Sequence, residues 1–195
     1  PGTPDAVYAS TSRGPNPYNL LKPDLAAPGV EILAAYTRWV SAAPAPFGGA
    51  VDVARNPIVN AISGTSMAAP HVAGSLALLR ALNRSWTPAQ LKSALTTTAK
   101  PDLREVDGVT PTTPFATGAG RIDVARASKA GLLLDETGAN YLAADPATGG
   151  DPSQLNIASF QKLECVGTCT FPRTLKSTRR ASVTWTATVQ GFAPG

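Results

Sequence analysis

The clearest structural signal in this chain is the sequence GTSMAAPHVAG, residues 64–74. A short run rich in β-branched residues, residues 58–62, precedes it, and apolar residues continue beyond it to Leu82. This pattern predicts a strand, a tight turn, and a helix from about Met67 to Leu82. Because apolar residues cover nearly the whole circumference of that helix, we expect it to be buried on most sides.

Further helices are predicted on the C-terminal side of this segment. Thr87 can cap a helix, Pro88 suits its first position, and Gln90 stands where the partner in a capping box belongs. This helix should end at about Thr97. A shorter helix is expected over residues 123–130, capped by an aspartate and ended by a glycine.

The remaining segments show strand or loop patterns. We expect a short strand within residues 5–12, a loop followed by an apolar strand within residues 25–34, and a surface loop at 39–56, which is rich in Pro, Gly and Ala. Residues 181–189 alternate between apolar and hydroxyl side chains with period two, which is typical of a half-exposed antiparallel strand. We therefore divide the chain into a mixed helix and strand unit at 1–134, a linker at 135–154 and a β unit at 155–195.

Composition limits the classes of function. The chain has 195 residues, of which 43% are hydrophobic and only 15% charged, against a usual charged share of about 25%. A surface so low in charge is common in exported proteins. The net charge of +4 is scattered, so the sequence predicts no nucleic-acid groove. No apolar run approaches the roughly 20 residues that cross a bilayer, and the polar start suggests a cut inside a longer protein.

Ser66 is the candidate nucleophile. A serine at the start of a helix is rigidly held, and the free N–H groups and dipole of the helix stabilise a developing oxyanion. Gly64 lets the backbone turn tightly and lets a substrate approach. A Gly-x-Ser triplet alone is common by chance, so on those three residues a simple helix cap is the better interpretation.

The longer string changes that interpretation. Residues 64–74 closely resemble the nucleophile motif of the subtilases, and KPDLAAPGV at 22–30, SRGP at 12–15 and GAGRID at 118–123 resemble its flanking segments. The resemblance covers roughly residues 5–130. The remainder resembles more loosely the fibronectin-III-like domain of the large, cucumisin-like branch. Taken together, these resemblances imply an α/β fold: the C-terminal portion of a subtilisin-like parallel-sheet domain, followed by a partial all-β domain.

By that resemblance Ser66 is the nucleophile of a secreted serine endopeptidase that acts on proteins or peptides. Its own N–H would form half of the oxyanion hole, and Gly64 and Thr65 would lie near the oxyanion or the substrate backbone. Subtilases order their triad Asp, His, Ser along the chain. The Asp, the His and the oxyanion Asn should therefore lie upstream, and this chain alone should be inactive. The alternative is an inert fragment or pseudoprotease that serves as a binding or structural module.

Two other residues could be mistaken for triad members. His71, the one histidine, follows Ser66 by five residues, which on a helix is about 500°, or some 140° around from Ser66. We expect a buried, structural histidine that points away from the hydroxyl, and we expect Asp24 to be structural too. An α/β-hydrolase is rejected, because Ala68 stands where its nucleophile motif needs glycine and no suitable histidine follows.

The two cysteines, Cys165 and Cys169, flank a glycine-containing turn. In an exported β-rich domain this spacing favours a local disulfide. We expect no cofactor or metal. Some subtilases bind calcium, but no cluster of carboxylates here can be assigned to a calcium ion.

Overall fold

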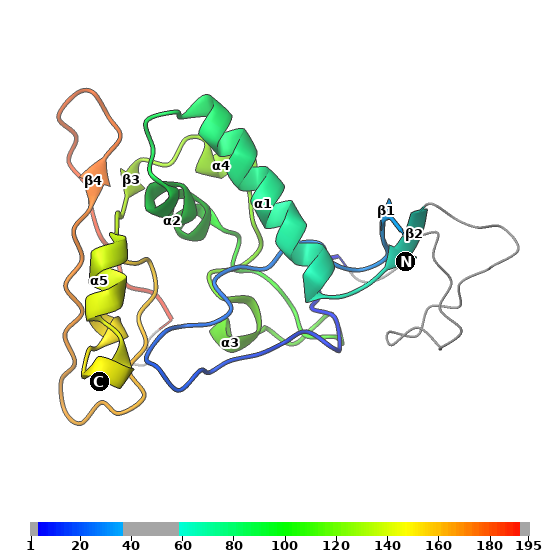
Figure 1. The fold of residues 1–195 in the computed structure, drawn as a ribbon, viewed down its shortest axis with the longest axis horizontal. Coiled ribbons are helices and arrows are strands. Elements are labelled where there is room, and N and C mark those ends of the chain that lie inside the picture. Colours follow the sequence, from blue (N-terminus) through cyan, green and yellow to red (C-terminus); the bar gives the residue numbers. More distant parts are fainter. Residues whose placement is uncertain (1–3, 37–58, 192–195) are drawn as a thin grey trace, which may run out of the picture.

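The computed structural model describes residues 4–36 and 59–191 (Figure 1). The predicted loop at 39–56 lies outside them. Strand β1 (Ile32–Ala35) pairs antiparallel with β2 (Val59–Ile62), and Ile32 stands opposite Ile62. These two strands confirm the ones predicted within residues 25–34 and at 58–62.

Two helices form the centre of the molecule. Helix α1 (Thr65–Leu82) follows β2 directly, and α2 (Pro88–Thr98) packs beside it (Figure 1). The predicted capping box is present: the Gln90 N–H donates to Thr87 Oγ1 at 3.1 Å, and the Thr87 N–H donates to Gln90 Oε1 at 3.2 Å. Such a cap is worth about 1 kcal/mol. No helix in the described part of the chain is long and apolar enough to cross a membrane.

Short elements complete the fold. Asp123 caps the helix predicted at 123–130 by accepting from the Arg126 N–H at 3.0 Å, but the helix ends at Ala127. Strand β3 (Leu132–Leu133) pairs antiparallel with β4 (Lys176–Ser177), on the side of the molecule opposite to β1 and β2 (Figure 1). The short elements are α3 (Pro114–Thr117), α4 (Val124–Ala127), β3 (Leu132–Leu133), α5 (Gly138–Ala143), β4 (Lys176–Ser177) and the 3-10 helices η1 (Pro146–Thr148) and η2 (Pro152–Gln154).

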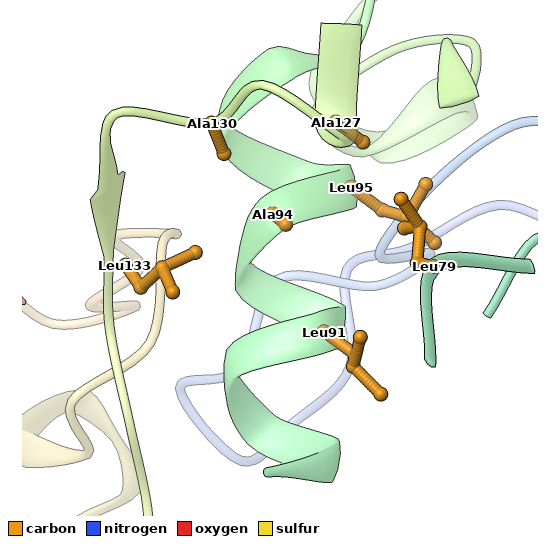
Figure 2. Packing of buried hydrophobic residues seen from close by; sticks show 7 residues of the cluster. All are labelled: Leu79, Leu91, Ala94, Leu95, Ala127, Ala130 and Leu133. Carbon is orange, nitrogen blue, oxygen red and sulfur yellow. The ribbon is translucent and has the colours of Figure 1, made fainter. Parts of the chain in front are cut away.

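The core lies where α1, α2, α4 and β3 meet. Leu95 of α2 lies against Leu79 of α1, and both are fully buried (Figure 2). Burying one leucine side chain stabilises a fold by about 1.5–3 kcal/mol. The buried cluster consists of Leu79, Leu91, Ala94, Leu95, Ala127, Ala130 and Leu133.

Helix α1 is less buried than the sequence predicts. Only Ser75 and Leu79 are buried, whereas Leu78 is 61% and Leu82 69% exposed. The expectation of burial on most sides is therefore wrong for the described part of the chain. Among the helices and strands, α2 and α4 supply the main packing contacts to α1, and they leave much of its apolar surface uncovered.

The described residues form no parallel sheet. Their parallel pairing is limited to single bridges between Ala6 and Arg104 and between Ala26 and Arg121. The strand predicted within residues 5–12 is reduced to the bridge at Ala6. The two sheets described here contain only antiparallel pairs. A parallel sheet would need strands joined by crossovers of a dozen or more residues.

The C-terminal part is mostly irregular. The strand predicted at 181–189 is wrong, because no ladder forms there. An extended segment needs a pairing partner to be stable, and this segment instead packs Trp185 on Gly131, where an added Cβ would lie 2.4 Å from the indole ring. The described residues build no β-sandwich. The expected linker at 135–154 contains α5, η1 and η2.

Arg173 organises this irregular part. Its guanidinium lies 4.9 Å from the centre of the Phe160 ring. It also donates hydrogen bonds to the carbonyl oxygens of Ile157 at 2.7 Å, Ser159 at 2.9 Å and Ser153 at 3.2 Å. A planar guanidinium with several donors suits this role, since it can bind several carbonyls and stack on an aromatic ring at once.

An ion pair between Asp151 and Lys162 should make stability depend on pH. The hydrogen bond from Lys162 is the main cause that lowers the pKa of Asp151 from 3.8 to about 2. A lowered pKa in the folded state gives stability that is present above about pH 4 and lost as pH falls towards about 2. Solvent screening keeps this contribution on the order of 1 kcal/mol. Urea unfolding of the wild type and Asp151→Asn at pH 5 and pH 2.5 should show a smaller loss in the variant; equal losses would contradict the prediction.

Candidate active site

Ser66 is the second residue of α1 and is exposed, as is Thr65. Gly64 is the N-cap, and α1 has neither a side-chain cap nor an acidic residue in its first turn. The N-terminal N–H groups of this 18-residue helix thus face no compensating side chain in the described part of the chain. Free N–H groups and the helix dipole together attract negative charge.

Most other helices begin differently. Five of them have a side chain that accepts a hydrogen bond from the first turn: Thr87, Asp123, Thr137, Asp145 and Asp151. Helix α3 also begins without a side-chain cap, so α1 and α3 share this feature, and α1 is the longest helix among the described residues.

The turn before Ser66 is held by a segment far away in the sequence. The Gly64 N–H donates to the Gly29 carbonyl oxygen at 2.7 Å. A Cβ on Gly29 would lie 2.8 Å from the Gly64 oxygen and 3.1 Å from Ala68 Cβ. The structure thus brings the KPDLAAPGV segment, residues 22–30, against the nucleophile motif, and only glycine fits at the contact.

His71 does not contact Ser66 through a hydrogen bond. Its Nδ1 lies 2.9 Å from the Met67 carbonyl oxygen, and among residues 4–36 and 59–191 no side chain hydrogen-bonds to Ser66 Oγ. The expectation that His71 is buried is wrong, because it lies on the uncovered side of α1 and is exposed.

Asp24 is placed in an ionic cluster. Its carboxylate accepts from Lys22 Nζ at 2.6 Å and lies 2.8 Å from Lys92 Nζ on α2. Burial raises the pKa of Asp24, but the hydrogen bonds from both lysines outweigh burial and hold the pKa below its ordinary value. This geometry fits the predicted structural role, since the carboxylate ties residues 22–24 to α2.

The cysteines form the predicted disulfide. The sulfur atoms of Cys165 and Cys169 are 1.99 Å apart. No group of three or more His, Cys, Asp or Glu side chains in the described ranges could hold a metal ion.

A cavity of about 250 Å³ lies between α2 and residues 156–160. Asp24, Lys92, Tyr141 and Phe160 are among its lining residues, and Ser66 is not. The cavity therefore plays no part in the candidate active site.

Comparisons with known proteins agree with the nucleophile motif. A model of the subtilase family of peptidases (Peptidase S8) matches residues 3–120. Subtilisin-like protease SBT1.7 of Arabidopsis thaliana is 44% identical over 168 residues, which are 82% of this chain and 21% of that protein. Subtilisin-like protease SBT1.3 of the same plant is 43% identical, over 77% of this chain and 20% of that protein.

The crystal structure of fervidolysin from Fervidobacterium pennivorans, a keratinolytic enzyme related to subtilisin, is 28% identical; the match covers 55% of this chain and 15% of that one, with a TM-score of 0.37. The chain spans about a fifth of the length of the plant relatives it matches. On the family match over residues 3–120, the chain belongs to the subtilase family of serine proteases.

Proposed function

We propose that this chain is the nucleophile-bearing part of a subtilisin-like serine endopeptidase. Ser66 Oγ attacks the carbonyl carbon of a peptide bond, and an acyl-enzyme forms as the amine leaves. The observation that carries the proposal is the position of Ser66 at the exposed, uncapped N-terminus of α1. There the Ser66 N–H can donate to the oxyanion, with Thr65 and Gly64 beside it along the bound substrate.

The rest of the machinery comes from a partner segment. We assign the general-base His, the Asp that orients it and the second oxyanion donor, an Asn, to an upstream part of the same protease. The length of the plant relatives supports this assignment, since the chain spans only about a fifth of it. Without that part the chain is expected to be inactive towards protein or peptide substrates.

The exposed face of α1 suits such a partner. Leu78 and Leu82 are more than half exposed although they stand on an apolar helix. Apolar side chains on one continuous helix face gain free energy when another part of the protein covers them. We assign the upstream part of the protease as the occupant of this face.

Secretion and a fibronectin-III-like domain at residues 155–195 belong to the same proposal. A disulfide between Cys165 and Cys169 persists in oxidising compartments. The alternation of apolar and hydroxyl side chains at 181–189 supports the assignment of the domain, although this segment forms no ladder in the described structure.

The test is covalent labelling. A fluorophosphonate probe should label Ser66 when the upstream part is present, either in the complete protein or as a separately expressed piece mixed with this chain, and should not label this chain alone. Absence of labelling in the complete protein would favour the alternative, an inert pseudoprotease that acts as a binding module.

A further inference from the structure

Glu31 and Ser63 form a reciprocal pair of hydrogen bonds. The Glu31 N–H donates to Ser63 Oγ at 2.8 Å, and the Ser63 hydroxyl donates to Glu31 Oε1 at 3.2 Å. The two residues are 32 positions apart in the sequence. No sequence pattern links them, because a pair this distant is made by the fold.

The backbone of Glu31 needs this support. Its φ is 51°, in the left-handed region that residues with a Cβ avoid. Residues held in that region persist where the surroundings fix them, and such residues cluster at functional sites. Here the fixing contact is Ser63, which binds both the backbone and the carboxylate of Glu31.

The pair stands directly in front of the nucleophile. The contacts between the two segments run in order from the β1–β2 ladder, where Ile32 pairs with Ile62, to the Glu31–Ser63 pair and then to the bond from the Gly64 N–H to the Gly29 oxygen. Ser66 follows two residues later, at the start of α1. The pair thus lies between the end of β2 and the first turn of α1.

We propose that Glu31 and Ser63 are positioning residues for the nucleophile: their reciprocal hydrogen bonds fix the turn from β2 into α1 and thereby the direction of Ser66 Oγ and of the Ser66 N–H. The inference rests on the proposed function. A misplacement of about 1 Å in a reacting group costs up to about 100-fold in rate, so loss of one such contact should be visible in turnover.

The experiment uses the complete protease and a chromogenic peptide substrate. We expect Ser63→Ala to lower kcat about tenfold, to leave KM within about twofold, and to slow fluorophosphonate labelling of Ser66 in proportion. Glu31→Gly, which suits a positive φ but lacks the carboxylate, should lower kcat without lowering the melting temperature. Glu31→Gln keeps an acceptor oxygen and should retain most of kcat.

Ser128→Ala is the matched control. Ser128 Oγ donates to the Ala125 carbonyl oxygen at 2.9 Å, at the end of α4, so its removal deletes a similar bond away from the site. The inference is overturned if Ser63→Ala and Glu31→Gly match Ser128→Ala in kcat, or if they lower only the melting temperature. Failure of the proposed function looks different, since the wild type would then show no labelling at Ser66.

Discussion

Replacing Ser66 by alanine in the complete protein is expected to lower turnover of a peptide substrate about 10⁶-fold, the loss that removal of the nucleophile causes in subtilisin. The residual rate over water comes from oxyanion binding and substrate positioning, which the start of α1 retains. The measurement is kcat for a chromogenic peptide, together with fluorophosphonate labelling, which should disappear. A variant that keeps more than about a hundredth of wild-type kcat would exclude Ser66 as the nucleophile.

His71→Gln is the control for that experiment. His71 lies on the same helix and has the chemistry of a general base, but its Nδ1 pairs with the Met67 carbonyl oxygen. We expect kcat to stay within about threefold of wild type, because a residue some 140° around the helix from Ser66 does not reach its hydroxyl. A loss as large as that of Ser66→Ala would mean that His71 takes part in proton transfer.

Gly120→Ala should lower the free energy of unfolding by about 3–5 kcal/mol. Its φ is 117°, and an added Cβ would lie 2.1 Å from the Lys100 carbonyl oxygen and 2.5 Å from the carbonyl carbon. Both atoms belong to backbone that cannot rotate away. The Gly120 carbonyl oxygen also accepts from the Ala26 N–H at 2.9 Å, so movement there would disturb residues 22–30 beside the site.

Gly138→Ala provides the comparison for Gly120→Ala. Gly138 begins α5, and nothing lies within 4 Å of the position its Cβ would take. The free energy of unfolding of the Gly138→Ala variant should differ from that of the wild type by less than about 1 kcal/mol, because alanine favours a helix more than glycine does. The prediction is tested by measuring the urea midpoints and melting temperatures of both variants in the complete protein. Equal midpoints would show that the contact with Lys100 relaxes freely.

The features predicted correctly from the sequence depend on neighbours in the chain. The α2 cap needs only Thr87, Pro88 and Gln90, all within one turn. The disulfide closes over four positions between Cys165 and Cys169. The helix after Gly64 follows from the local residue pattern, and the long motif there is also what identifies the family.

The features predicted wrongly depend on what a segment packs against. Burial of His71 and of α1 requires a covering element, and α2 and α4 cover one side only. A strand at 181–189 requires a partner with which to form a ladder. Side-chain alternation shows that a segment is able to pair, but it does not supply the partner.

The sequence alone thus placed the candidate nucleophile at the start of a helix, because the motif and the helix signals are contiguous in the chain. The tertiary structure alone showed how that start is held: Gly29 against Gly64, and Glu31 bonded to Ser63 across 32 positions. The physical reason is the same for both contacts. A contact between residues far apart in the chain requires that a long loop be closed, and the packing of the whole fold brings the two ends of that loop together. A local sequence pattern contains no information about that packing.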